Sequence, residues 1–124
     1  MRPIPAYGTT HADYFYGEVP CTRILSAQEI EEAYEKNTGK VIAETFKEID
    51  ENAIGGVVVA NHGPFTWGQT PEKAVDTAIT LEEVAKMALF TKQIVPDAER
   101  VDEYLLEKHY SRKHGKNAYY GQGG

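Results

Sequence analysis

The sequence predicts a single α/β domain, and three observations support this fold class. The chain has 124 residues, which is long enough for one hydrophobic core but leaves no room for two. An apolar run of three valines and an alanine at positions 57–60 is typical of a buried strand. Further stretches combine helix-capping residues with apolar side chains at helical spacing, so helices are expected to pack beside that strand.

Residues 1–20 show no helical pattern. They are rich in Pro, Gly and Tyr, and we expect a loop with short strand pieces, followed by a short strand at residues 19–23. The N-terminus has no apolar core of signal-peptide length, and no apolar run approaches the length of a membrane span. The sequence therefore predicts no membrane partner.

Two helices are predicted before the strand. Ser26 and Glu29 form a capping box, in which the Ser hydroxyl and the Glu carboxylate each satisfy a free backbone N–H, so a helix should run to about residue 36. Thr38 is expected to cap a second helix, in which apolar side chains recur at i, i+3 and i+4 from Val41 onwards.

The strand at residues 57–60 follows a turn at residues 52–56. Its three consecutive valines predict burial on both faces and hence a central position in the sheet. Thr70, Pro71 and Glu72 then mark a strong helix start, and that helix should run to about residue 94. A last helix is expected over residues 97–114, ending at a glycine.

The charge balance is acidic, with 13 basic and 19 acidic residues and a formal net charge of −6. This argues against nucleic acid as the main partner, because phosphate backbones are bound by basic surfaces. The acidic residues cluster at 29–35 and 44–51, where solvated helix faces are expected. Cys21 is the only cysteine, so no intrachain disulfide can form, and a cytoplasmic location is expected.

His62 follows the apolar strand and is itself followed by Gly-Pro, so a rigid element presents one imidazole at a strand end. A zinc site needs about three such ligands. The chain has four histidines, and the other three are distant in sequence. Either His62 has a structural role, or part of its site lies outside this chain.

Asp13 is the second candidate, because it lies among aromatic residues in the segment 8–17. Such surroundings could raise its pKa and suit it to proton transfer. On an extended segment, His11 and Asp13 would also point to the same side, as metal ligands sometimes do. The alternative is a loop aspartate that caps backbone N–H groups.

The C-terminal segment holds the third group of candidates. The charges at residues 108–114 could stabilise a helix C-terminus through its dipole. Alternatively, His109 and Arg112 could form an anion site, because residues three apart share a helix face. Tyr120 could extend into a pocket as an acid or simply pack against the surface.

Together these segments resemble the L-ribulose-5-phosphate 4-epimerases of the class II aldolase superfamily. The motifs occur in the same order and with similar spacings across nearly the whole chain, and they favour the epimerases over the fuculose-phosphate aldolases. The matching motifs are GTTHADYFYG at 8–17, PCTR at 20–23, HGPFTWG at 62–68, KHYSRKHG at 108–115 and AYYGQ at 118–122.

The resemblance covers only the C-terminal half of the family's domain. It implies that residues 1–124 form an incomplete domain, namely the C-terminal half of a three-layer α/β/α class II aldolase-like fold with a mainly antiparallel sheet. The family's N-terminal half carries a His-x-His pair and an acid that bind zinc, together with loops that hold the substrate phosphate. No His-x-His occurs here, so we expect a truncated product, a late start or one piece of a split protein.

The resemblance also implies roles for individual residues. His62 matches a zinc-binding histidine, and the remaining Zn²⁺ ligands are expected on the missing half. Asp13 and Tyr120 match a pair of catalytic acid/bases, with Tyr120 acting in the site of a neighbouring subunit, and His109 matches a histidine of that same intersubunit site. Thr10 and Glu35 also match positions around the family's site. Together with Arg112, proposed above for an anion site, they are the residues expected in the substrate's vicinity.

The chemistry implied by this family explains the need for two acid/bases. C4 of a ribulose phosphate bears no acidic proton, so epimerisation proceeds by retro-aldol cleavage of the C3–C4 bond. Zinc acts as a Lewis acid that stabilises the enediolate of dihydroxyacetone. The glycolaldehyde phosphate fragment rotates, and re-addition gives D-xylulose 5-phosphate. One proton donor is needed for each face of the aldehyde.

Two alternatives to the epimerase stay open. One is a class II sugar-phosphate aldolase of the fuculose-phosphate type, and the other is a non-catalytic remnant or interaction module. The expected partners are a sugar phosphate, further copies of the chain in a homotetramer, and a separate N-terminal half. The chain alone is expected to be inactive, and to aggregate or oligomerise through exposed strand edges and apolar surface. The sequence does not distinguish arabinose breakdown from ascorbate breakdown.

Overall fold

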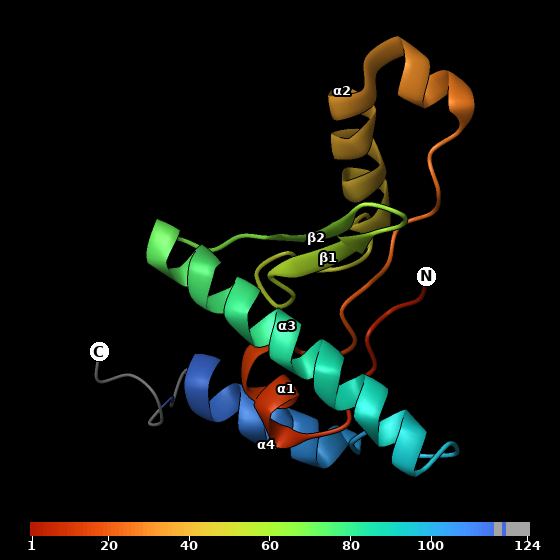
Figure 1. The fold of residues 1–124 in the computed structure, drawn as a ribbon. Helices are drawn as coiled ribbons and strands as arrows, with labels where there is room; N and C mark the ends of the chain where they lie inside the picture. Colours follow the sequence, from red (N-terminus) through yellow and green to blue (C-terminus); the bar gives the residue numbers. More distant parts are fainter. Residues whose placement is uncertain (116–117, 119–124) are drawn as a thin grey trace.

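The computed structural model describes residues 1–115 and 118, in which helices flank a small antiparallel sheet (Figure 1). This arrangement confirms the α/β class. The elements in chain order are α1 (Thr9–Tyr14), α2 (Ala27–Thr45), β1 (Gly56–Val59), β2 (Gly63–Thr66), α3 (Pro71–Ile94) and α4 (Glu103–His114).

Strand β1 lies between two neighbours, as its valines predicted. On one side it pairs with β2 in antiparallel register, with Val57 opposite Phe65. On the other side, the Val58 N–H donates to the Pro20 carbonyl at 2.9 Å, and the Thr22 N–H donates to the Val58 carbonyl at 2.9 Å. Residues 19–23 therefore supply isolated bridges rather than the regular strand expected there.

The turn between β1 and β2 presents His62. The His62 N–H donates to the Val59 carbonyl at 3.0 Å, which closes a β-turn. Asn61, the third residue of that turn, has a φ of 64°, a conformation that asparagine tolerates better than most residues. The sequence pattern does not predict β2, because Gly63 and Pro64 interrupt it. Pro64 is accommodated because it lies on an edge strand.

Helix α2 begins at the predicted capping box. The Glu29 N–H donates to the Ser26 hydroxyl at 3.2 Å, and the Ser26 N–H donates to the Glu29 carboxylate at 2.7 Å. Two helical segments are present, as predicted, but they meet at a break at Ala33, with φ −163° and ψ 72°, so the predicted start of the second one at Thr38 was wrong. Thr38 lies inside the helix, where its hydroxyl donates to the Tyr34 carbonyl at 2.8 Å.

Helix α3 begins as predicted, with the Lys73 N–H donating to the Thr70 hydroxyl at 3.2 Å and proline in the first turn. It packs on α1, β1 and β2. Its buried side covers the main hydrophobic cluster. The buried members of that cluster are Ile4, Phe15, Val19, Ile54, Leu81, Val84 and Ala88.

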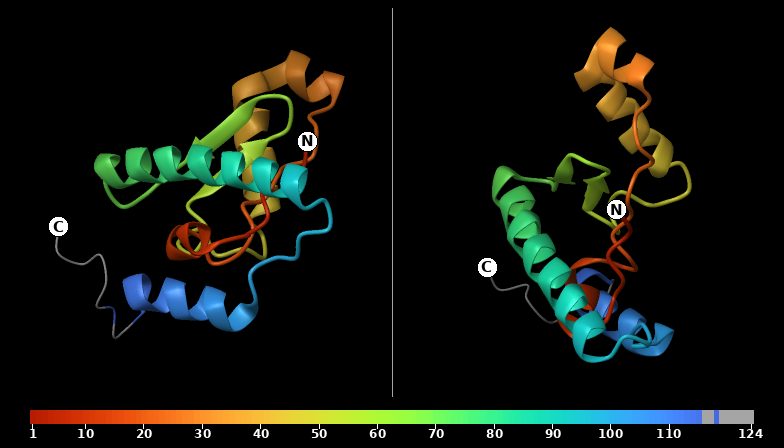
Figure 2. Two further views of the ribbon diagram at one scale, coloured as in Figure 1. Left: turned by 60° about the horizontal axis from the view of Figure 1, so that its bottom comes forward. Right: turned by 45° about the vertical axis from the view of Figure 1, so that its right-hand side comes forward.

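Helix α1 was not predicted, because residues 1–20 have no helical pattern. It has only six residues and no side-chain cap, so its own sequence does little to stabilise it. Tertiary packing explains it instead: α1 lies between α3 and α4 (Figure 2), and His11 and Ala12 are buried there. Because the segment is helical, His11 and Asp13 do not point to the same side.

Helix α4 starts later than predicted, because Asp102 rather than Asp97 caps it, accepting a hydrogen bond from the Leu105 N–H at 3.0 Å. It ends at His114, before Gly115, as expected. Among the described residues, no helix combines the length and the apolar character needed to cross a membrane. Tyr120 lies outside the described residues.

Candidate functional site

Asp13 lies in the last turn of α1, where its carboxylate meets α4. The His109 Nδ1 atom is 3.0 Å from Asp13 Oδ1, and the Arg112 Nη2 atom is 3.4 Å from each carboxylate oxygen. All three side chains are largely shielded from solvent. The structure therefore brings together three of the residues singled out in the sequence, across a separation of 96 positions between Asp13 and His109.

The polar contacts of the Asp13 carboxylate differ from those expected. The sequence predicted an aromatic setting, whereas the carboxylate faces an imidazole and a guanidinium of α4. Arg112 places a permanent positive charge beside it, and His109 can donate a hydrogen bond to it. The arrangement suits a carboxylate that is held in one orientation and exchanges protons with a neighbouring group.

Side chains in the last turn of α4 also contact the backbone of Asp13 and the ring of the next residue, Tyr14. The His114 Nε2 atom donates to the Asp13 carbonyl at 2.8 Å, and the Lys113 ammonium lies 4.5 Å from the centre of the Tyr14 ring. The Tyr14 hydroxyl donates to Asp76 of α3 at 3.0 Å. Burial raises the pKa of Tyr14, so this hydroxyl stays a neutral donor at ordinary pH.

A cleft of about 590 Å³ opens beside Asp13, which we call the Asp13 cleft. Its volume is in the range of small-molecule sites. Its polar lining contains both acids and amines, and it joins α1, α3, α4 and the loops around the hairpin. The lining residues are Asp13, Tyr14, Glu51, Asn52, Gly55, Trp67, Gly68, Gln69, Lys73, Asp76, Thr77, Lys113 and His114.

Trp67 gives this cleft a fixed aromatic wall. Its indole N–H donates to the Glu51 carbonyl at 2.8 Å, and its ring packs edge-on against Phe46 with centroids 5.1 Å apart. An immobilised aromatic face among hydrogen-bonding groups suits a small polar molecule with one apolar side, as sugars have. Lys73 at the start of α3 adds a cation that could meet an anionic group.

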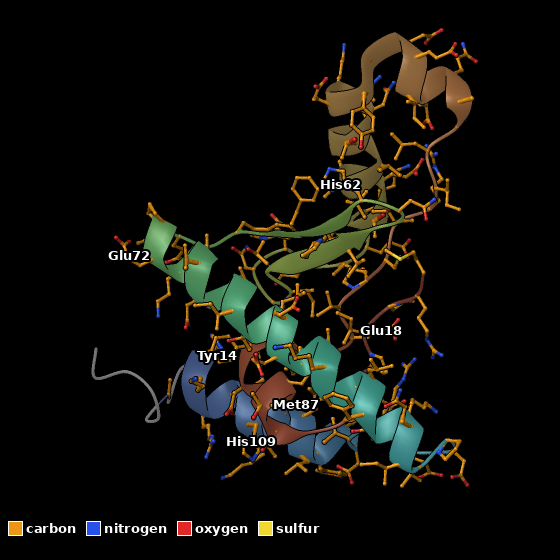
Figure 3. The ribbon with its side chains drawn as sticks, viewed as in Figure 1. Tyr14, Glu18, His62, Glu72, Met87 and His109 are labelled. Atoms are coloured by element: carbon orange, nitrogen blue, oxygen red, sulfur yellow. The ribbon has the colours of Figure 1, made fainter. Side chains whose placement is uncertain are left out.

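His62 lies apart from the Asp13 cleft. It is exposed on the hairpin turn, whereas His109 lies on α4 at the other end of the molecule (Figure 3). Its ring is 5.0 Å from that of Phe65 and 6.4 Å from that of Tyr34. The strand fixes the position of its backbone, as predicted, but its neighbours are aromatic.

The residues that the structure describes do not form a zinc site by themselves. Zinc is bound by three or four protein ligands. Within residues 1–115 and 118, no group of three or more His, Cys, Asp or Glu side chains is placed to hold a metal ion. His11 does not serve either, because it is buried and its Nε2 atom lies 2.6 Å from the Gly17 carbonyl.

The remaining predicted residues lie elsewhere. Thr10 is exposed on α1 and lines a separate cavity of about 60 Å³ between the N-terminal segment and α3. Glu35 is exposed on α2, which packs against β1 and not against α1 or α4. The structure therefore groups Asp13, His109 and Arg112 and leaves Thr10 and Glu35 outside the group.

Sequence reasoning missed part of the Asp13 cleft. Lys73 and Asp76 carry no signal, because charged residues on an exposed helix turn are ordinary. Trp67 and His114 lie in the motifs at 62–68 and 108–115, but the spacing of residues in the sequence does not predict which residues they contact. The available signals were a single tryptophan three residues after Gly63-Pro64 and a histidine before a helix-ending glycine.

Comparisons with known proteins agree with the resemblance seen in the motifs. The family model described as "Class II Aldolase and Adducin N-terminal domain" matches residues 1–89. The L-ribulose-5-phosphate 4-epimerases UlaF of Salmonella paratyphi C (strain RKS4594) and Salmonella choleraesuis (strain SC-B67) are each 56% identical to the chain over 119 residues. The corresponding protein of Salmonella typhi is 55% identical.

These matches cover the two proteins unequally. Each includes 96% of this chain but only 52% of the relative, so the chain spans about half the length of the curated relatives it matches. The motif resemblance is confirmed by sequence identity along nearly the whole chain. The chain belongs to the class II aldolase and adducin family.

Proposed function

We propose that this chain is part of an L-ribulose-5-phosphate 4-epimerase, an isomerase that converts L-ribulose 5-phosphate into D-xylulose 5-phosphate. The observation that supports this most is the 56% identity over 119 residues to proteins of that name. The Asp13 cleft is consistent with it, because it is a polar cleft of small-molecule size with a carboxylate in its wall.

In this proposal the chain is the C-terminal half of a three-layer α/β/α domain with a mainly antiparallel sheet. Two features support it: the relatives are about twice as long as the matched region, and the described part contains only a two-stranded sheet. Such a sheet is marginal unless more strands or helices cover it. The aldolase alternative is the weaker one, because the relatives named above are epimerases and only the general family description includes aldolases.

Asp13 is the proposed acid/base on one face of the substrate. As a base it takes the proton of the C4 hydroxyl while the electrons of the C3–C4 bond pass to the ketone fragment. In the reverse reaction it is the acid that gives a proton to the aldehyde oxygen as the C3–C4 bond re-forms. His109 and Arg112 hold its carboxylate in place, and Tyr120 is the proposed partner on the opposite face.

Zinc stays a proposal for the assembled protein. His62 offers one imidazole, and the described residues provide no further ligands beside it, so the other ligands would have to come from outside them. The sugar-phosphate substrate is likewise a proposal, supported by the names of the relatives. The homotetramer, a separate N-terminal half and the cytoplasmic location are proposals that rest on the sequence and its family resemblance alone.

A non-catalytic role is the second candidate. The observation that favours it for this chain on its own is that residues 1–115 and 118 hold no three-ligand metal cluster. The two candidates differ in one respect: an epimerase half regains activity when the other half is supplied, and a remnant does not.

The test supplies that other half. The part of the Salmonella paratyphi C relative that this chain does not cover is fused ahead of residue 1, and formation of D-xylulose 5-phosphate is measured in the presence of Zn²⁺. We expect turnover, and Asp13→Asn should reduce it about 100-fold or more, because a positioned acid/base contributes that much. Asp97→Asn, in the exposed turn before α4, is the matched control. A folded, zinc-loaded fusion with no turnover would favour the non-catalytic role.

A further inference from the structure

Helix α3 is apolar on opposite sides. Leu81, Val84 and Ala88 are buried against α1 and the hairpin. On the other side, large apolar residues recur at spacings of three, four and eight, which places them on one face. These residues form what we call the outer α3 stripe: Val75, Ile79, Met87, Phe90 and Ile94.

The outer α3 stripe is exposed to solvent. Ile79 is 61% exposed and Ile94 is 80% exposed. The elements that pack on α3 within residues 1–115 are α1, β1 and β2, all on its inner side. Figures 1 and 2 show no other helix or strand over this outer side, and Met87, at its edge, also lines the small cavity beside the N-terminal segment. A helix that borders water on one side normally has a polar face there.

The charge pattern within the stripe adds a second feature. Glu83 and Lys86 lie near its middle and form an ion pair at 3.0 Å, with about half of each side chain exposed. The surface that covers α3 should therefore be apolar at both ends and polar in the middle. The pair is also exposed enough to be rearranged by a contacting hydrogen-bonding group.

The length of the relatives indicates what covers this face. A helix that is apolar on two opposite sides is typical of one that packs between two parts of a larger domain. The matched relatives contain about as much chain again beyond the region matched here. We propose that the outer α3 stripe is the surface on which the other half of the domain packs. This inference rests on the proposal that the chain is half a domain, and does not depend on the epimerase activity.

The test compares the accessibility of α3 with and without the other half. In a Cys21→Ser background, Ile79→Cys is labelled with a thiol reagent in the chain alone and in the fusion described above. Tyr104→Cys is the matched control, because Tyr104 is 87% exposed on α4 and lies outside the stripe. We expect labelling at position 79 to slow at least tenfold in the fusion and labelling at position 104 to stay unchanged.

A second measurement addresses a fusion that does not fold. The fusion's near-ultraviolet circular dichroism and melting are recorded with and without the paired change Ile79→Asp and Phe90→Asp. These charges should abolish cooperative melting of the fused half while leaving the melting of the chain alone unchanged. Equal labelling rates in a cooperatively folded fusion would overturn the proposal. So would protection of Ile79→Cys in the chain alone that rises with concentration, because a second copy would then cover the stripe.

The outcomes also separate this inference from the proposed function. Protection at position 79 without turnover would leave the docking surface standing and reject the epimerase. Turnover in a fusion in which position 79 is still fully reactive would support the epimerase and reject the docking surface.

Discussion

Removing the Asp13 carboxylate should loosen helix α4 from the rest of the chain. Helix α4 has no fully buried residue and packs on α1, where Asp13 accepts from His109 at 3.0 Å and faces Arg112 at 3.4 Å. A hydrogen bond to a charged, shielded group contributes about 1.5–3 kcal/mol. The longer Arg112 contact adds about 0.5 kcal/mol or less.

Asp13→Ala should therefore cost about 2–3 kcal/mol in the free energy that keeps α4 packed on α1. This corresponds to a local opening about 30- to 150-fold more frequent. Native-state amide hydrogen exchange measures it directly, because exchange of the α4 amides should accelerate by that factor while the α3 amides change far less. Asp13→Asn should have about half the effect, since its amide oxygen can still accept from His109.

Two comparisons keep this reasoning falsifiable. Asp97→Ala removes an exposed carboxylate and should leave α4 exchange unchanged. A double-mutant cycle of Asp13→Ala with His109→Ala should give a coupling of about 1 kcal/mol or more. If α4 exchange in Asp13→Ala stays within about threefold of the unmodified chain, the carboxylate does not hold the helix and the magnitude above is wrong.

Three further predictions concern stability, each measured by urea unfolding. Burial lowers the pKa of His11, so as pH falls the unfolded chain binds a proton at this residue before the folded chain does. The free energy of unfolding should therefore decrease as pH falls below about 6.5 and level off below the lowered pKa. His11→Gln should remove the contribution of this residue to the pH dependence. An unchanged pH slope in that variant would refute it. Leu81→Ala, at a side chain 2% exposed, should cost about 2–5 kcal/mol, whereas Leu89→Ala on the exposed side should cost about 0.5 kcal/mol or less. Ser26→Ala removes one half of the capping box and should cost about 1 kcal/mol; no change would mean that Glu29 alone suffices to start α2.

The parts of the fold that were predicted correctly depend on short-range chemistry. The capping box at Ser26 and the Thr70 helix start are set by residues within one turn, so the sequence is enough to find them. The run of valines identified β1 because burial on both faces leaves a continuous apolar run. Helix α1 and the break at Ala33 depend on packing and on distant partners, and no local pattern signals either.

The candidate site shows the same division. That His109 and Arg112 share a helix face follows from their spacing, but that this face meets Asp13 does not, since 96 positions separate Asp13 from His109. Their spacing identified both residues as a possible anion site, and the family resemblance added a role for His109. That His62 lies on the hairpin turn, away from Tyr14 and His109 (Figure 3), was not predicted, because sequence order alone does not place a hairpin turn relative to α4.

Pro64 limits how this chain can self-associate. The Trp67 N–H donates to the Gly55 carbonyl at 3.0 Å. Because hydrogen-bonded pairs alternate along an antiparallel ladder, the backbone N–H and C=O of Phe65 point toward β1, and the backbone nitrogen of Pro64 points toward the opposite, outer edge of β2. Proline offers no N–H there, and an incoming strand would find a gap in its hydrogen-bond ladder. Fibril-like growth by strand addition is therefore disfavoured at this edge. Aggregates of the isolated chain should instead retain a helical circular dichroism spectrum, because their contacts would form between helices.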